Sequence, residues 1–237
     1  MQAKVSILIP FYNCSYVDQA IESALKQDYE NIEIVLIDDG STLYLEKLKP
    51  YKKKIVYIKK ENGGTATALN LGLEKATGDY IAWLSSDDLF MPDKISKQLK
   101  FMLENKLDAS FTNYHIIDKF NNVLFPWHCK RFTSITEVYK EFITTNVING
   151  CTVLIKKEVF EKIGGFNEVF KYTHDYEMWY RLLSKGYQMH YLDDVLTKFR
   201  THEDSGTSRY QNEMISEMRM IESYYRPQLI QYIICNL

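Results

Sequence analysis

The first hundred residues alternate between short apolar runs and stretches in which apolar residues recur every three or four positions. Short apolar runs that close on turn residues are typical of buried strands, whereas the longer spacing is typical of one helix face. The runs predict strands over 5–9, 32–37, 55–58 and 80–84. The spacing predicts helices over 17–25 and 66–76, and a third helix with Pro92 in its first turn.

This alternation predicts an α/β fold with a mostly parallel, Rossmann-like central sheet that is flanked by helices on both faces. The second half of the chain is less regular. Its patterns predict strands over 109–114, 123–125, 151–155, 189–192 and 195–199, and helices over 136–144, from Asp175 to the residue before Gly186, and over 210–237. We expect one domain, residues 1–208, with functionally distinct halves 1–105 and 106–208, followed by a C-terminal helical extension, residues 209–237.

Composition argues against several other classes of protein. The 237 residues carry a net charge of −2, so no general attraction to nucleic acid is expected. The four cysteines are far apart and form no Cys-x-x-Cys pair, which argues against a zinc knuckle or disulfide framework and fits a reducing compartment. No apolar run approaches the ~18 residues of a membrane span. We therefore expect a soluble cytoplasmic protein, and leave peripheral association with the inner face of the cell membrane open.

Two polar segments, Asp38-Asp39-Gly40-Ser41 and Ser85-Ser86-Asp87-Asp88, directly follow predicted strands. In parallel sheets ligands bind beyond the carboxyl ends of the strands, so both segments are expected at one ligand-binding edge. Carboxylates such as Asp87 and Asp88 bind Mg²⁺ or Mn²⁺ together with substrate phosphates. The same pair can equally open a loop and cap the next helix, and the pair alone does not decide between these roles.

Asp38 and Asp39 leave a similar choice open. A carboxylate at this position can accept hydrogen bonds from a ribose or from the N3–H group of uracil. It can also form an Asx-type turn, with Gly40 in a left-handed conformation.

The second half contains further candidates. Asp175 stands at the start of a predicted helix, where an aspartate either caps the helix or serves as a general base within reach of a hydroxyl. His202 follows a strand in a polar loop, where a histidine is either solvated or, as neutral imidazole, completes a metal site with Arg200 near a phosphate. The residues alone leave both choices open.

These segments are individually weak signals, but their order and spacing are specific. In chain order they are Val5-Ser6-Ile7-Leu8-Ile9-Pro10-Phe11-Tyr12-Asn13, Ile37-Asp38-Asp39-Gly40-Ser41-Thr42, Asn62-Gly63-Gly64, Gly78-Asp79-Tyr80-Ile81, Leu84-Ser85-Ser86-Asp87-Asp88, Phe160-Glu161-Lys162-Ile163-Gly164-Gly165-Phe166, Asp175-Tyr176-Glu177-Met178-Trp179 and Arg200-Thr201-His202. Over residues 4–208 the chain resembles glycosyltransferase family 2, the inverting family with the GT-A fold. The resemblance implies that residues 1–105 bind the nucleotide sugar and that 106–208 supply the acceptor side and the catalytic base.

The resemblance also implies a role for each matching position. The nucleotide-contacting positions are Pro10 and Tyr12 beside the base and ribose, Asp38 and Asp39 at the uracil or ribose, Asn62, and Asp87 at the donor ribose or sugar. Asp88 corresponds to the metal ligand, His202 to a histidine that ligates the metal or touches the diphosphate, and Asp175 to the catalytic base. Two positions depart from the family pattern: Ser86 opens the Asp-x-Asp variant, and His174 replaces the usual acidic residue before the base.

The implied reaction is an inverting transfer of a hexose or N-acetylhexosamine to a hydroxyl of a glycan or lipid-linked acceptor. The implied donor is a nucleoside diphosphate sugar, with UDP favoured, and the implied cofactor is Mn²⁺ or Mg²⁺. Acceptor recognition is expected around Trp127, Asn149, Gly150 and Tyr172. A nucleotide-sugar-binding module without turnover stays open as the alternative. A sugar nucleotidyltransferase is disfavoured, because the loop at residues 11–15 has no basic residue. The sugar, linkage and oligomeric state are left open.

Overall fold

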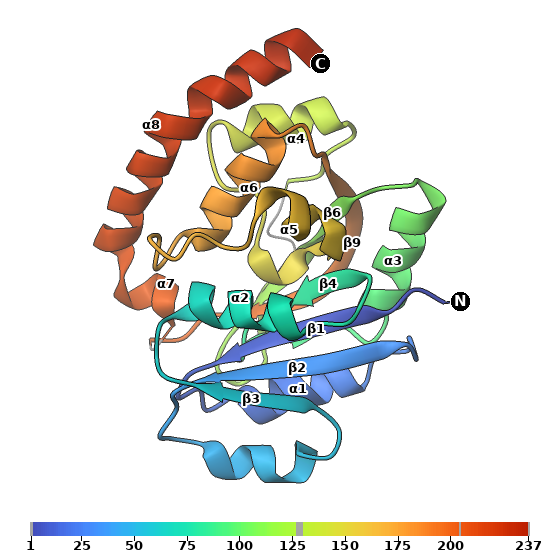
Figure 1. Ribbon diagram of the computed structural model, residues 1–237, viewed down its shortest axis with the longest axis vertical. Coiled ribbons are helices and arrows are strands. Elements are labelled where there is room, and N and C mark those ends of the chain that lie inside the picture. Colours follow the sequence, from blue (N-terminus) through green and yellow to red (C-terminus); the bar gives the residue numbers. More distant parts are fainter. Residues whose placement is uncertain (1, 127–129, 204, 237) are drawn as a thin grey trace.

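One mixed sheet runs through the part of the chain that the computed structural model describes, which is residues 2–126, 130–203 and 205–236. Its strands are β1 (Val5–Phe11), β2 (Ile32–Asp39), β3 (Val56–Lys60), β4 (Tyr80–Trp83), β5 (Leu89–Phe90), β6 (Ala109–Ile117), β7 (Val123–Phe125), β8 (Leu154–Lys156) and β9 (Met189–Arg200). They lie in the order β3-β2-β1-β4-β8-β6-β9-β5, with β7 paired to β6. Figure 1 shows the first strands at one end of the molecule and the second half above them.

Helices cover both faces of this sheet. They are α1 (Val17–Leu25), α2 (Thr65–Lys75), α3 (Lys94–Glu104), α4 (Ile135–Phe142), α5 (Lys157–Ile163), α6 (His174–Ser184), α7 (Gly206–Arg209) and α8 (Gln211–Asn236), with 3₁₀ turns η1 (Leu45–Tyr51) and η2 (Gly150–Thr152). Alternate residues of β1 face opposite sides. Ile7 and Ile9 pack with α1 and α3, whereas Leu8 packs in the cluster that contains α2, α5 and α6.

The predicted α/β class is confirmed, and the parallel arrangement holds for β1 to β4. Strands β1 and β2, β1 and β4, and β2 and β3 pair in parallel. The second half differs, because β8 pairs antiparallel with both β4 and β6, and β5 pairs antiparallel with β9. The sheet is therefore parallel at one end and mixed at the other, rather than mostly parallel throughout.

Several elements differ locally from those predicted. The predicted strand 151–155 starts instead as the η2 turn, because the Asn149 side chain accepts the Cys151 N–H at 2.9 Å and the Asn149 backbone carbonyl accepts the Thr152 N–H. The two short strands predicted over 189–199 are one strand, β9, whose pairing with β6 shifts register near Asn113. Helix α3 begins at Lys94, two residues after Pro92, and α5 was not predicted.

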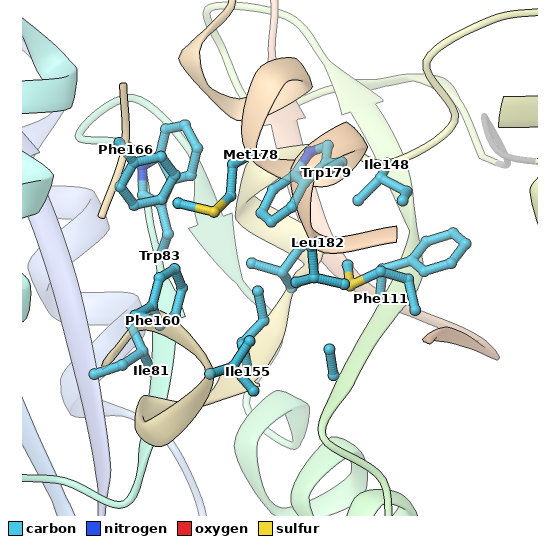
Figure 2. Close-up of a cluster of buried hydrophobic side chains, with 14 of the residues drawn as sticks. Ile81, Trp83, Phe111, Ile148, Ile155, Phe160, Phe166, Met178, Trp179 and Leu182 are labelled. Atoms are coloured by element: carbon cyan, nitrogen blue, oxygen red, sulfur yellow. The ribbon is translucent and has the colours of Figure 1, made fainter. Parts of the chain in front are cut away.

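The predicted helical character of the C-terminal segment is confirmed by α8, which packs along α6 (Figure 1). Ile221 and Leu229 bury their side chains in the cluster that includes α6. Figure 2 shows the centre of that cluster, where side chains from β4, α5 and α6 meet. Among the described helices, none has the length and apolar character that crossing a membrane requires.

Candidate active site

The carboxyl ends of β1, β2 and β4 meet at one edge of the sheet, because these strands are parallel. Their loops are tied together. The Asn13 side-chain oxygen accepts the N–H groups of Thr42 and Leu43 at 2.8 Å each, and the Ser41 hydroxyl oxygen accepts the Asn13 N–H at 3.1 Å. Both predicted polar segments therefore lie on the edge expected for a ligand.

Asp38 is buried and shapes this edge from within. One carboxylate oxygen accepts the Ser41 N–H at 2.7 Å, and the other accepts the Tyr57 hydroxyl at 2.5 Å. Gly40 has φ +79°, and a Cβ there would lie 2.8 Å from the Asn62 backbone nitrogen. The turn interpretation of this segment is confirmed. The Asp38 carboxylate, predicted at the uracil or ribose, has protein donors on both oxygens.

Asp39 is also buried, but its hydrogen-bond donors come from the end of β3 and the segment that follows it. Its oxygens accept the Lys60 ammonium at 2.6 Å, the Asn62 amide at 3.1 Å, and the N–H groups of Gly63 and Gly64 at 3.0 and 2.8 Å. A carboxylate has about four acceptor positions. The structure thus brings the predicted residues Asp39 and Asn62 together, and a ligand that binds Asp39 must share or replace one of these donors.

The two predicted residues after β1 differ in exposure. Pro10 is buried within the strand and pairs with Ile37 of β2. Tyr12 is 54% exposed at the open end of the strand. Only Tyr12 offers its ring to a molecule at this edge.

The chain turns after β4, as a shared site for two neighbouring carboxylates requires. The Asp88 N–H donates to the Ser85 carbonyl at 3.1 Å. One Asp88 oxygen accepts the Arg200 N–H at 2.8 Å, whereas the other is buried and has no hydrogen-bond partner among the described residues. Burial, reinforced by the neighbouring charge of Asp87, raises the pKa of Asp88.

Arg200, predicted near a phosphate, is fully buried and engaged by the protein. Its guanidinium donates to the backbone carbonyls of Asp87 at 2.7 Å and Asp118 at 3.1 Å, and to the Gln19 side chain at 3.1 Å. It also lies 4.3 Å from the centroid of the Tyr16 ring. In this structure Arg200 connects the end of β9 to the turn after β4, to the segment after β6 and to α1.

His202 meets Asp87 rather than Asp88. Its Nε2 lies 3.0 Å from an Asp87 oxygen, and its ring lies 5.2 Å from the Tyr16 ring. Among the described residues, no three His, Cys, Asp or Glu side chains form a group that could hold a metal ion by themselves. The donor set still fits Mn²⁺ or Mg²⁺, because the unpaired Asp88 oxygen is a hard ligand and these cations commonly take one or two carboxylates plus substrate phosphates.

Asp175 is the second residue of α6, so Thr173 rather than Asp175 occupies the N-cap position. One Asp175 oxygen accepts the Tyr176 N–H at 2.7 Å. Burial raises the pKa of Asp175 to about 6, and the negative charge of Glu217 acts in the same direction. A carboxylate with this pKa is mostly ionised at neutral pH and is a stronger base than an ordinary aspartate.

His174 joins the start of α6 to the end of β4. Its ring centroid lies 5.5 Å from that of Trp83 and 5.8 Å from that of Phe166, beside the cluster shown in Figure 2. Burial lowers the pKa of His174 to about 4, so the ring is neutral at physiological pH. The residue that departs from the family pattern therefore packs as an uncharged aromatic group next to Asp175.

The residues predicted to recognise the acceptor make different kinds of contact. Gly150 packs against Trp83 so closely that a Cβ would lie 2.2 Å from the indole ring. Tyr172 stacks on Tyr210 with ring centroids 4.3 Å apart. Asn149 forms the cap of η2, and Trp127 lies outside the described residues.

Sequence reasoning did not find three groups that complete the site. Lys60 pairs with Asp39 from the end of β3, and Tyr16 contacts both Arg200 and His202. Glu217 of α8 contacts the segment before Asp175. Each is far in sequence from the residues that it contacts, so no local motif marks it.

The comparisons with known proteins identify the family of this chain. The profile of glycosyl transferase family 2 matches residues 6–164. Over 216 residues the chain is 39% identical to an uncharacterised glycosyltransferase of Rickettsia typhi, with 89% of this chain and 68% of that protein covered. The chain belongs to glycosyltransferase family 2. It spans between 31% and 36% of the length of three longer relatives from other Rickettsia species.

One further relative of this glycosyltransferase and one solved structure with a similar fold are informative. Over 227 residues it is 33% identical to WfaP of Escherichia coli, a UDP-Glc:α-D-GlcNAc-diphosphoundecaprenol β-1,3-glucosyltransferase, with 92% of this chain and 86% of WfaP covered. The crystal structure of S. aureus TarS 1–349 in complex with UDP-GlcNAc superimposes with a TM-score of 0.76 at 19% identity, covering 97% of this chain and 71% of that chain. The predicted family, the GT-A fold and the assignment as a transferase enzyme are confirmed.

Proposed function

We propose that this glycosyltransferase moves a sugar from a UDP-linked donor to a hydroxyl of a glycan or lipid-linked acceptor, with inversion at the anomeric carbon and Asp175 as general base. One relative and one structural neighbour support these substrate classes. WfaP is named for UDP-Glc and a GlcNAc-diphosphoundecaprenol acceptor, and TarS has been crystallised with UDP and with UDP-GlcNAc.

The observation that most supports the proposal is the contact between α6 and the end of β4. The packing of His174 on Trp83 holds the start of α6 against the strand that leads into Asp87 and Asp88. Asp175 follows His174 directly, so the proposed base belongs to the same region as the proposed donor edge. Its raised pKa, about 6, suits proton abstraction near neutral pH.

In the proposed reaction, the acceptor oxygen forms a bond to the anomeric carbon while its proton passes to Asp175. The bond from the anomeric carbon to the phosphate oxygen breaks, and its electron pair leaves with UDP. Asp88 is the residue that would hold Mn²⁺ or Mg²⁺ through its unpaired oxygen. A bound divalent cation stabilises the charge that develops on a leaving phosphate.

The substitution Asp175→Asn tests the base. It preserves size and the hydrogen bond from Tyr176, but removes the group that accepts the proton, so turnover should fall by about 10²- to 10⁴-fold. UDP release is measured with UDP-Glc and UDP-GlcNAc, Mn²⁺ and a GlcNAc-diphosphate lipid. UDP binding should be retained.

Asp28→Asn is the matched control, because Asp28 is an exposed carboxylate outside the proposed site. Near-normal turnover of Asp175→Asn would exclude Asp175 as the base. Donor binding without turnover in the unsubstituted protein would favour a binding module, and release of pyrophosphate in place of UDP would favour a nucleotidyltransferase.

A further inference from the structure

The backbone before Asp175 is held by one side chain of α8. The Glu217 carboxylate accepts the N–H groups of Lys171, Tyr172 and Thr173 at 3.0 Å each, and the Thr173 hydroxyl at 2.7 Å. Hydrogen bonds to an ionised acceptor are stronger than those between neutral groups. Four of them on three consecutive residues fix the path of the chain into α6.

Glu217 also replaces a missing cap. Thr173 is the N-cap residue of α6, but its own side chain accepts no backbone N–H there; its hydroxyl donates to Glu217 instead. The N-terminus of a helix favours a nearby negative charge. A carboxylate from another helix therefore supplies the anion that stabilises the start of the helix that carries Asp175.

The position of Glu217 is itself fixed by the packing of α8 on α6. The Tyr176 hydroxyl donates to Glu222 at 2.9 Å, and the Tyr225 hydroxyl donates to Glu177 at 2.7 Å. Ile221, which directly precedes Glu222, is buried. Figure 1 shows α8 running along α6 on the outside of the molecule. Glu217 thus contacts the segment before Asp175 from a helix that packs against α6.

We propose that Glu217 is the positioning residue of the catalytic base: it holds residues 171–173 so that the Asp175 carboxylate stays at the acceptor side of the donor edge, and it sets the negative charge beside Asp175. The proposal rests on the proposed role of Asp175. It makes α8 part of the catalytic unit, although α8 lies beyond both the matched residues 6–164 and the domain predicted over 1–208.

The charges around Asp175 indicate that Glu217 acts on Asp175 electrostatically as well as by holding the backbone before it. Burial is the larger cause of the raised pKa of Asp175, and the charge of Glu217 adds to it. His174 on the same helix is neutral, because burial lowers its pKa to about 4. Asp87 and Asp88 follow β4, the strand on which His174 packs. Glu217 is thus a charged group of α8 that acts on Asp175.

The test compares Glu217→Gln with Glu213→Gln, an exposed residue one turn earlier on α8. Glu217→Gln keeps the shape but removes the charge and part of the accepting capacity. Because misplacement of a reacting group costs up to about 100-fold, kcat should fall about 10- to 100-fold, with KM for the UDP-sugar nearly unchanged. The acidic limb of the kcat–pH profile should move to lower pH, because loss of a neighbouring negative charge lowers the pKa of Asp175.

A second readout does not depend on activity. Amide hydrogen exchange at residues 171–173 should accelerate by about tenfold or more in Glu217→Gln. The neutral amide that replaces the carboxylate accepts weaker hydrogen bonds from these N–H groups. Glu213→Gln should match the unsubstituted protein in both readouts. Unchanged exchange and an unmoved acidic limb in Glu217→Gln would overturn the proposal. Normal turnover of Asp175→Asn would instead contradict the proposed role of Asp175. The exchange measurement would still show whether Glu217 holds residues 171–173.

Discussion

Asp38, Asp39 and Asp88 are all almost completely buried, yet their partners differ. Asp38 has a protein donor on each oxygen, and Asp39 has four donors in all. Asp88 keeps one oxygen without a hydrogen-bond partner among the described residues. A buried acceptor left without a donor is costly, and a bound cation removes that cost. The number of donors, rather than burial, distinguishes Asp88 from the other two, and it supports the metal-ligand role that the family resemblance implies for this residue.

Ionisation of the buried Asp175 should lower the free energy of unfolding at neutral pH. Its folded-state pKa, about 6, lies above its ordinary value of 3.8, because burial disfavours the charged form. The folded state therefore binds the proton more tightly, and the stability linked to this group is lost as pH rises from about 4 through about 6. Asp175→Asn, which never ionises, should show a higher Tm than the unsubstituted protein at pH 7.5.

The difference in Tm should shrink as pH falls through about 6 and disappear below about 4, where the aspartate is protonated in both states. Thermal unfolding of the two proteins between pH 4 and 8 measures this. A constant difference across that range would show that Asp175 ionises as an ordinary exposed carboxylate.

At the scale of the elements, local patterns predicted the first half well. The strands that became β1 to β4 are short apolar runs, and α1 and α2 bury the apolar face that their spacing indicated. The second half depends more on distant partners. The two predicted strands form the single strand β9 because its pairing with β6 continues through a shift of register, and η2 follows from the Asn149 cap. Neither cause leaves a periodic pattern in the sequence.

The same limit applies to the candidate site. Asp39, Asp87, Asp88 and Asp175 were found because they stand at predicted strand or helix ends, where sequence motifs accumulate. Glu217 was not found, because its partners are more than forty positions away and its helix has no matching motif. A long-range hydrogen bond to a backbone N–H group constrains the identity of only one of the two residues, so the sequence carries little trace of it.

Arg200 is a buried side chain that holds several elements together by hydrogen bonds. Its guanidinium reaches the turn after β4, the segment after β6 and α1 at once. Lysine has a single terminal nitrogen and cannot keep all three bonds. Since buried acceptors left unpaired cost about 1–3 kcal/mol each, Arg200→Lys should lower the free energy of unfolding by about 2–4 kcal/mol.

Denaturant unfolding measures this change, with Arg219→Lys as the control. Arg219 is exposed on α8, and its substitution should change the free energy of unfolding by less than about 0.5 kcal/mol. If Arg200 acts instead through a donor phosphate, Arg200→Lys should leave unfolding unchanged and weaken UDP binding alone.

At the scale of the whole molecule, the site is assembled from both halves of the chain. The proposed donor edge comes from β1, β2 and β4. Arg200, His202 and His174, the residue before Asp175, come from the second half and contact the end of β4 or the turn after it. The join between the halves is made by buried contacts, including His174 on Trp83 and the Asp88 carboxylate on the backbone of β9. Binding at the donor edge should therefore stabilise the molecule as a unit.

This arrangement predicts how metal and nucleotide act together. Among the described residues there is no group of three metal-ligating side chains, so Mn²⁺ should bind weakly until a diphosphate supplies the missing oxygens. Mn²⁺ alone should hardly change Tm, UDP alone should raise it modestly, and the two together should raise it by more than the sum. A ligand that binds only the folded state stabilises it according to its concentration over Kd, so the excess measures the coupling. Asp88→Asn should abolish that excess while keeping the shift with UDP alone. A large shift with Mn²⁺ alone would mean that the protein holds a complete metal site without the nucleotide.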